Sequence, residues 1–448
     1  MSELIETYSL KDIFRENLSK NKFLAEYQQK SWDQFEKTGL PSRKDEKWKH
    51  TNLRSLSNKK WTSSNISCSQ EDLQKIDKKL EGEKEPFLVL LNGTLVLEAS
   101  SKDIKKHLTI RSLEELSSQD ELQPYSHLAS EKNDPILSLT EAMASKSFLA
   151  KVTTRQSKKP IRIYNFISKK TTEPQVCFSR FIFDFQKNTE ANIQFLSLDL
   201  DEKKPTELEG DITTWASVLL ELRVCEGANI NFSTFQDTAY NCFHILTKRV
   251  EIKSNATLSC LNLSTGAKVS RQTSYVDITG NNSQADIDGL YLTNRQQHTD
   301  HYLNIDHQVP YSQSSQNYKG LLNDASKAIF QGSIHVAENA QKTSAHQLNK
   351  NLLLTKTAGA ITKPNLTIEA DDVKCTHGAT VSPLREDEVF YLQSRGITRK
   401  KAKNLLCQSF AKDVLQNHTY PGSILETKSY VSSWDKWFEH LEKGEKAI

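Results

Sequence analysis

The 448-residue chain lacks the features that mark several large classes of protein. It has only 15 glycines and 11 prolines, too few for a collagenous or low-complexity chain. No run of 18 apolar residues occurs, and the first residues, MSELIETYSLKDIF, contain no apolar segment of the kind found in signal peptides. From these absences we expect a soluble, cytoplasmic protein.

The chain also has few cysteines and a small net charge. An odd, dispersed set of cysteines is not a disulfide framework and fits a reducing compartment. The net charge is +3, and basic residues are not interleaved with aromatic ones, which argues against nucleic acid as a partner. The seven cysteines, none in a Cys-x-x-Cys pair, are Cys68, Cys177, Cys225, Cys242, Cys260, Cys375 and Cys407.

Familiar catalytic motifs are missing too. The chain has no G-x-x-x-x-G-K-[ST] phosphate loop, no G-x-S-x-G and no H-E-x-x-H, so we predict that it is not an enzyme. The group His298, His301, Asp306 and His307 looks like a metal site at first sight. On a strand, however, positions i and i+3 face opposite sides, so His298 and His301 should not converge.

Alternation with a period of two dominates the middle of the chain. Asn92-Gly93 lies between two apolar runs and predicts a hairpin. A helical interlude is expected near 113–149, and short strands follow over 151–380. Four segments share a small residue followed by alternating apolar positions, and the last three begin 28 and 29 residues apart: Ala191–Phe195, Ala228–Phe232, Ala256–Cys260 and Ala285–Gly289. This period favours a β-solenoid, although a Greek-key sandwich can imitate it.

A polar stretch over 310–351 fits stacked coils. Its Ser, Gln and Asn side chains need partners inside a packed fold, and identical amides on successive coils can hydrogen-bond to one another. We interpret His335 and His346 as polar members of such ladders rather than as metal ligands.

Helical patterns occupy both ends, giving an N-terminal helical region (1–86), a β core (87–381) and a C-terminal helical region (382–448). Gly396 ends one helix and Thr398 caps the next, in which Ala402, Leu405, Leu406 and Phe410 form an apolar stripe. Trp434, Trp437 and Phe438 indicate that the tail docks onto the core. Because a stacked core buries its own apolar residues, we expect it to stand without these helices.

Cys375 and His377 form the most informative pair, at the end of a strand-like run that begins at Ile361. Residues i and i+2 of a strand face the same side, about 6.6 Å apart, so a thiolate and an imidazole are offered together. Two ligands do not close a metal or cluster site. Either distant residues of this chain or a partner chain completes the set, or the pair merely packs.

Several motifs resemble those of the SufB/SufD family of iron–sulfur cluster assembly proteins, over about residues 39–415. The run from Glu369 to Val381, EADDVKCTHGATV, favours the SufD branch over the SufB branch. The other matching segments are Gly39–Leu53, Leu88–Thr94, Asn351–Leu354, Thr362–Pro364 and Phe390–Ile397.

The resemblance implies a fold and a role. The fold would be a right-handed parallel β-helix, mainly β, flanked by N-terminal and C-terminal helical regions. The role would be that of a non-catalytic scaffold subunit of the SUF complex, which pairs with SufB and binds the ATPase SufC. Cys375 and His377 match the family's interface residues, where a transient Fe–S cluster or its precursors would lie; no cofactor would be bound permanently. A homodimer of the isolated chain stays open.

The family's contact with SufC lies in its C-terminal helices. The matching residues here are Phe390, Tyr391, Arg395, Gly396, Leu405 and Leu406. Where the family commonly has acidic residues after the helix cap, this chain has Arg399, Lys400 and Lys401. These cations are either drift on a solvated face or a complement to an acidic surface of the ATPase.

Two alternatives remain from the sequence. A β-helix carbohydrate-active enzyme would need converging carboxylates, for which Asp286, Asp288 and Asp306 are the candidates, and such enzymes are usually secreted. A purely structural partner would use Cys375 and His377 for packing alone.

Overall fold

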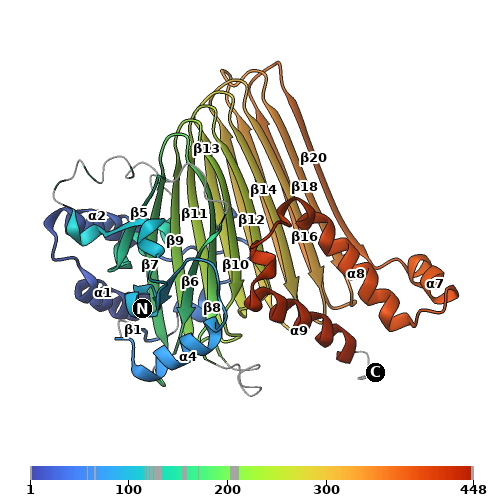
Figure 1. Cartoon of the computed structure of the whole chain (residues 1–448), viewed down its shortest axis with the longest axis horizontal. Coiled ribbons are helices and arrows are strands. Elements are labelled where there is room, and N and C mark those ends of the chain that lie inside the picture. The colour runs from blue at the N-terminus through green and yellow to red at the C-terminus, as the bar shows by residue number, and fades with distance from the viewer. Residues whose placement is uncertain are drawn as a thin grey trace.

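The chain folds into a β-solenoid of about seven turns with helices at its flanks (Figure 1). The structure is a computed structural model. It describes residues 3–57, 59–64, 67–116, 118, 121, 125, 134–153, 159–169, 171–201 and 211–444. The expected mainly β architecture with helical ends is confirmed, and the solenoid prevails over the sandwich.

Two sheets of ten strands each form the walls of the solenoid, and successive strands from β5 onward alternate between them. The strand pairs are parallel except for β2–β3 and β4–β5, which are antiparallel. Sheet A contains β1 (Thr62–Ser63), β4 (Thr109–Ser112), β5 (Ser147–Val152), β7 (Gln175–Phe185), β9 (Thr214–Val224), β11 (Cys242–Ile252), β13 (Val269–Ile278), β15 (His298–His307), β17 (Lys327–Val336) and β19 (Gly359–Ile368). Sheet B contains β2 (Phe87–Leu91), β3 (Thr94–Leu95), β6 (Ile161–Ile167), β8 (Glu190–Asp199), β10 (Asn229–Asp237), β12 (Thr257–Ser264), β14 (Gln284–Thr293), β16 (Gln313–Leu322), β18 (Ser344–Leu353) and β20 (Lys374–Pro383).

The predicted repeats lie on consecutive strands of sheet B, but their register differs from the simple alignment of alanines. Ala191 pairs with Ile230, which pairs with Leu258, which in turn pairs with Ala285. The repeat is therefore displaced by two residues between some coils. Because a shift of two keeps a side chain on the same face, all four positions still point into the apolar interior.

The predicted polar ladders are present. Gln347 Nε2 donates to Gln316 Oε1 on the neighbouring coil at 2.7 Å, and these residues are in register. On the outside of the coils, His335 Nδ1 lies 2.6 Å from Asp306 Oδ1, and His346 Nδ1 lies 2.8 Å from Thr376 Oγ1. Both histidines therefore bind polar side chains of adjacent coils, as expected.

The N-terminal region covers the outer face of sheet A. It comprises α1 (Glu3–Asn17), α2 (Lys22–Thr38), α3 (Arg54–Ser57) and, beside sheet B, the surface helix α4 (Gln70–Leu80). Gly39 ends α2 with φ +66°, a conformation that glycine adopts without strain. The Asn92-Gly93 turn joins antiparallel β2 and β3, and both residues have positive φ, which confirms the hairpin.

The expected helical interlude is only partly correct. Asp134 caps α6 (Pro135–Met143), whose residues are all buried. The segment that follows, Ser147–Val152, is strand β5 rather than helix, because it pairs with β7 and its alternate residues Phe148, Ala150 and Val152 face the solenoid interior. Much of 117–133 lies outside the described residues.

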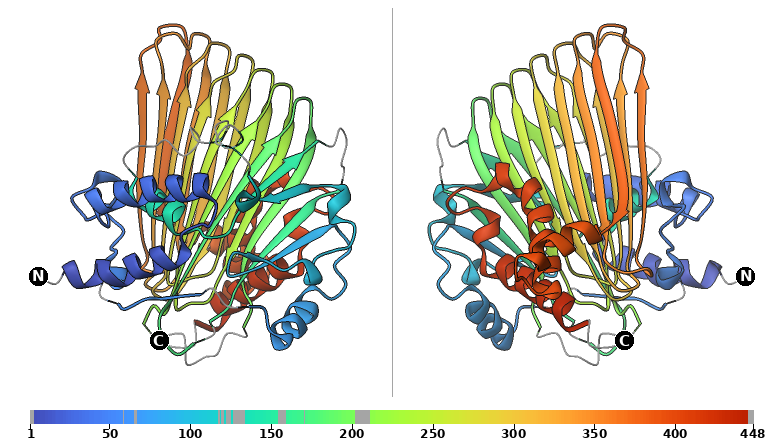
Figure 2. Two further views of the ribbon diagram at one scale, coloured as in Figure 1. Left: turned by 90° about the vertical axis from the view of Figure 1, so that its left-hand side faces the viewer. Right: turned by 90° about the vertical axis from the view of Figure 1, so that its right-hand side faces the viewer.

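The C-terminal region contains α7 (Glu386–Ser394), α8 (Arg399–Leu415) and α9 (Lys428–Gly444). Figure 2 shows α8 and α9 running along one flank of the solenoid. Tyr430, Trp437 and Phe438 are buried, so the predicted docking of the tail is confirmed. They join one apolar cluster with outward leucines of sheet B, among them Leu261, Leu290 and Leu321.

This docking corrects two expectations. The solenoid does not bury all its apolar residues by itself, since the outer leucines of sheet B depend on α8 and α9 for cover. The buried face of α8 is also shifted from the predicted stripe: of that stripe only Ala402 is fully buried, and Leu405 is 41% exposed. The other buried positions of α8 are Cys407, Ala411, Val414 and Leu415.

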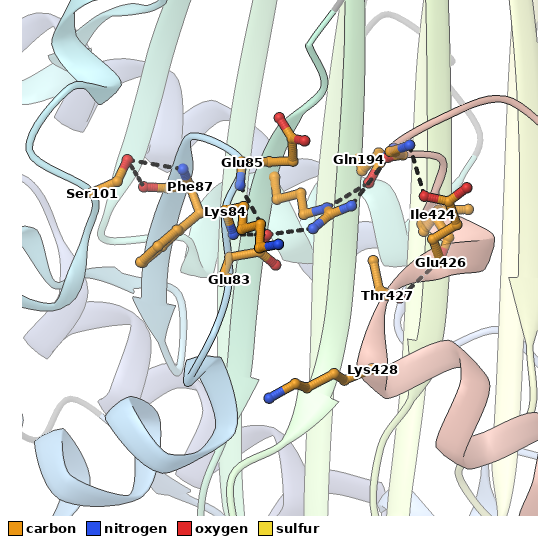
Figure 3. A network of polar contacts seen from close by, with 12 residues as sticks. Glu83, Lys84, Glu85, Phe87, Ser101, Gln194, Ile424, Glu426, Thr427 and Lys428 are labelled. Carbon is orange, nitrogen blue, oxygen red and sulfur yellow. Dashed lines mark hydrogen bonds and ion pairs between the residues drawn. The ribbon is translucent and has the colours of Figure 1, made fainter.

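A polar network ties the C-terminal tail to the start of the core (Figure 3). Arg162 binds Glu83 through Nη1 and donates from Nη2 to the Gly422 carbonyl at 3.1 Å. Gln194 donates to the same carbonyl at 2.8 Å. Chain segments separated by more than two hundred residues are thereby held together.

Two further observations concern the molecule as a whole. All seven cysteines are free thiols, as the sequence predicts. None of the helices in the described part of the chain is both long and apolar enough to span a membrane.

Candidate functional site

The last coil of the solenoid, which we call the terminal coil, consists of β19 and β20. Each is the outermost strand of its sheet, so one row of backbone N–H and C=O groups faces away from the fold (Figure 1). Every residue of these two strands is exposed or half-buried, whereas at least half of the residues in β17 and in β18 are buried. The terminal coil is therefore an open end of the β-stack.

Cys375 and His377 lie on the same face of the terminal coil, as predicted. Cys375 pairs with Ala345 and His377 with Gln347, both buried residues that point into the interior. Their position within the strand differs from the prediction: they are at the start of β20, not the end of a strand. The run from Ile361 is broken after Ile368, where a bend at Asp371-Asp372 leads from sheet A to sheet B.

The Cys375 thiol is half-buried against an apolar cluster that contains Ile334, Val336 and Ala345. This burial raises the pKa of the Cys375 thiol, and a hydrogen bond with the Ala345 backbone opposes the rise. A protonated thiol is a weak ligand and nucleophile. Coordination of a metal or cluster would require loss of that proton, which a nearby cation favours.

His377 is exposed beside an open depression of about 430 Å³. Its floor and rim include Gln316, Gln347 and Thr376. An exposed imidazole at this position is accessible to a partner from beyond the end of the stack, and can act as a ligand or a proton acceptor.

Other candidate ligand sets do not assemble. Among the residues that the structure describes, no group of three or more His, Cys, Asp or Glu side chains is placed to hold a metal ion. His298 Nε2 lies 3.1 Å from Thr51 Oγ1 of the N-terminal region, on the outer side of sheet A. His301 is buried inside, stacked on the Tyr291 ring at 4.8 Å, and burial lowers its pKa to about 3. The predicted divergence of His298 and His301 is confirmed.

The carboxylates considered for sugar chemistry do not converge. Asp286 and Asp288 lie on β14 in sheet B, and Asp288 Oδ2 is 2.9 Å from His418 Nε2. Asp306 lies on β15 in sheet A, engaged with His335. They form no common catalytic site.

Apolar residues of the terminal coil were not identified from the sequence. Ile368 pairs with buried Val336 and Val381 with buried Asn351, so both point toward the interior side of the stack. They are nevertheless 41% and 40% exposed, because no further coil covers them. Ile361, on β19, is 40% exposed. Such residues on an open sheet end are typical of an interaction surface.

The helical hairpin α7–α8 carries a second apolar patch. Phe390 is 72% exposed, more than any other large hydrophobic residue in the described part of the chain, and Tyr391 is 58% exposed. The Arg395 guanidinium lies 5.4 Å from the centre of the Tyr391 ring. Gly396, with φ +82°, turns the chain toward α8, where Leu405 is exposed and Leu406 half-buried. The predicted contact residues thus gather on one projecting hairpin (Figure 1).

Cations at the start of α8 are partly compensated. Arg399 Nη2 lies 2.7 Å from Glu386 Oε1, and Arg385 pairs with Asp387 and Glu388, both in the first turn of α7. Lys400 and Lys401 make no ion pair with any residue that the structure describes. Among the described residues, the cations of this patch without an ion pair are therefore Lys400 and Lys401, and Arg399 is not one of them.

Comparison with known proteins identifies the relatives of this chain. Residues 167–410 match the family model described as "SUF system FeS cluster assembly, SufBD core domain", and residues 4–163 match "SufBD protein N-terminal region". The iron–sulfur cluster assembly protein SufD of Escherichia coli is 27% identical over 392 residues, which cover 87% of this chain and 88% of the relative. A SufBD family protein of Synechocystis is 26% identical over 84% of this chain and 83% of its own length. The chloroplastic protein ABCI7 of Arabidopsis thaliana is 34% identical over 45% of this chain and 43% of its own length.

Proposed function

This chain belongs to the SufBD family of iron–sulfur cluster assembly proteins, and from that premise we propose that it is the non-catalytic, SufD-type scaffold subunit of a SUF complex. In that role it pairs with a SufB-type chain through the terminal coil and binds a SufC-type ATPase through α7–α8. The observation that carries the proposal is the open terminal coil, which presents Cys375 and His377 on one accessible face.

The terminal coil has the properties that pairing requires. Two ten-residue strands end the stack, and a partner strand can add to each by backbone hydrogen bonds. Ile368 and Val381 would be covered by the partner. The same contact would bring the partner's ligands to Cys375 and His377, so that an Fe–S cluster or its precursors, carried as cargo, is bound jointly and transiently.

The ATPase contact is supported by the α7–α8 hairpin. Exposed aromatic side chains are typical anchors of protein interfaces, and Phe390 and Tyr391 stand outside the fold's own apolar clusters. Since α8 also packs on sheet B, movement of the hairpin by a nucleotide-driven partner would be transmitted to the solenoid.

Co-expression with a SufB-type and a SufC-type chain tests this function. We expect co-purification as one complex of one SufB-type, one SufD-type and two SufC-type chains, measured by size exclusion with light scattering, and iron and sulfide in the purified complex. A chain that stays apart from both partners would refute the proposal. The isolated chain, measured in parallel, shows whether it forms a homodimer.

A further inference from the structure

A second concave site lies in the N-terminal region, far from Cys375 in the sequence. It is a pocket of about 730 Å³ enclosed by the end of α2, the loop after Gly39, the segment 51–57 and Trp61. Its volume falls in the range of small-molecule sites, which is about 300–1,000 Å³. The function proposed above assigns it no role.

The inner surface of this pocket is apolar. Its accessible apolar side chains are those of Leu40 and Pro41, which are half-buried, and beneath them lie core residues such as Phe35 and Trp61 that are at most 3% exposed. Trp61 is held in place because its indole Nε1 donates to the Leu56 carbonyl at 2.7 Å. The apolar surface therefore exists without a ligand and would not have to be assembled on binding.

The rim of the pocket is cationic. Arg43, Lys44 and Arg54 line it and are exposed, and none of the three makes an ion pair with a residue that the structure describes. No Asp or Glu is among the described residues that line the pocket. Elsewhere in the same region cations do have acidic partners, such as Lys11 with Glu36 at 2.6 Å and Lys49 with Glu46 at 3.9 Å. Three uncompensated cations around one cavity favour an anion there.

The frame of the pocket is anchored to the solenoid. The Thr51 hydroxyl, also in the pocket lining, binds Asp300 and lies 3.1 Å from His298 Nε2, both on β15. Trp48, next to this segment, is stacked by the Arg271 guanidinium at 3.9 Å. A ligand in the pocket would therefore also stabilise the contact between the N-terminal region and sheet A.

We propose that this pocket binds a small anionic amphiphile, a molecule that carries a phosphate, sulfonate or carboxylate on an apolar body. The apolar body would lie against Leu40 and Pro41, and the anionic group would lie among Arg43, Lys44 and Arg54. Arg43 and Arg54 offer forked donors that suit such oxyanions.

Equilibrium binding of three probes to the full chain tests the proposal. The probes are 1-anilinonaphthalene-8-sulfonate, its neutral relative N-phenyl-1-naphthylamine, and inorganic phosphate. The pocket variant is Arg43→Ser with Lys44→Ser and Arg54→Ser, all at exposed positions. The matched control is Lys102→Ser with Lys105→Ser and Lys106→Ser, which removes the same charge from exposed positions outside the pocket. Circular dichroism melts verify that both variants fold.

We expect the sulfonate to bind with one site per chain and to raise the melting temperature. It should bind at least five-fold more weakly to the pocket variant and unchanged to the control, and the neutral probe should bind more weakly than the sulfonate to the unmodified chain. Inorganic phosphate alone should compete poorly, because it lacks the apolar body. Equal weakening in both variants, equal binding of the two aromatic probes, or no saturable site would each overturn the proposal.

Discussion

At the residue scale, the chemistry of Cys375 depends on the partial burial of its thiol. The apolar cluster behind it raises the pKa of the thiol, so in the isolated chain the protonated form is favoured at neutral pH. A metal or a cationic partner group arriving from beyond the stack would reverse that preference. On the function proposed above, the Cys375 thiol would become a ligand only after a partner has docked.

A second titrating residue, Glu141 on α6, lies buried between α2 and the outer face of sheet A. Tyr27 Oη donates to it at 2.6 Å and Ser31 Oγ at 3.0 Å. Arg180 is already bound to Glu221 through Nε at 2.6 Å and Nη2 at 3.2 Å. Burial raises the pKa of Glu141 to about 7, although Arg180 opposes the rise.

This pKa predicts a pH-dependent stability. The folded state holds the Glu141 proton more tightly than the unfolded state, so stability falls as the pH rises from about 4.5 to about 7. Each pKa unit corresponds to roughly 1.4 kcal/mol, so the full effect is on the order of 3 kcal/mol. Glu141→Gln should lose this pH dependence. Its urea midpoint, relative to that of the unmodified chain, should therefore be higher at pH 8 than at pH 5. Glu16→Gln, at an exposed position, is the control. If the urea midpoints of Glu141→Gln and the unmodified chain differ by the same amount at pH 5 and pH 8, the account is contradicted.

The sequence predicted correctly which residues share a face of a strand, because the two-residue period of a strand determines this. The shared face of Cys375 and His377 and the divergence of His298 and His301 both follow from alternation. It missed Ile368 and Val381, because their exposure depends on the coil being the last one, which no local pattern encodes. It also missed the pocket beside Trp61, which arises from segments brought together by the N-terminal fold.

At the element scale, the α7–α8 hairpin allows a direct test of the proposed ATPase contact. Phe390→Ser with Tyr391→Ser should reduce the affinity for the SufC-type chain at least tenfold, equivalent to about 1.4 kcal/mol. Both side chains are exposed, so the melting temperature should stay close to that of the unmodified chain. Leu97→Ser with Tyr311→Ser, at exposed positions off the hairpin, is the control for calorimetric titration. Undiminished affinity of the hairpin variant would place the contact elsewhere.

The basic start of α8 leads to a kinetic prediction. Arg399 already has a partner in Glu386, so Lys400 and Lys401 are the cations to reverse. Lys400→Glu with Lys401→Glu should slow association with the chain's own SufC-type partner at low salt, and the difference should shrink at high salt because ions screen long-range attraction. The change places acidic residues in the first turn of α8, where the helix dipole favours them, so stability should hold or rise slightly. Lys102→Glu with Lys105→Glu is the control, and equal low-salt rates for all three chains would show that the patch has no role in association.

Elements with strong local signals were predicted well. The Asn92-Gly93 hairpin and the Thr398 cap both depend on a few adjacent residues. The interlude near 149 and the stripe of α8 were less accurate, because Ser147–Val152 becomes a strand only by pairing with β7, and the buried face of α8 is chosen by the leucines of sheet B.

At the scale of the whole molecule, the two ends of the solenoid differ. At the first end, Ile104 and Leu108 join the interior cluster and cover it. The outer faces are covered by the N-terminal region on sheet A and by α8 and α9 on sheet B. The terminal coil is left exposed, and it is there that Cys375 and His377 lie. The partner chain proposed above would cover this long edge pair.

The most direct test of this account is the cluster content of the co-expressed complex that carries His377→Ala. The exposed imidazole contributes little to folding, about 0.5 kcal/mol or less, so the complex should assemble with unchanged mass. Its iron and acid-labile sulfide should fall well below those of the unmodified complex, because alanine cannot act as a ligand or proton acceptor. His107→Ala, at the other end of the solenoid, is the control and should keep its iron and sulfide. Full iron and sulfide in an intact His377→Ala complex would contradict the assignment of the terminal coil as the cluster-bearing interface.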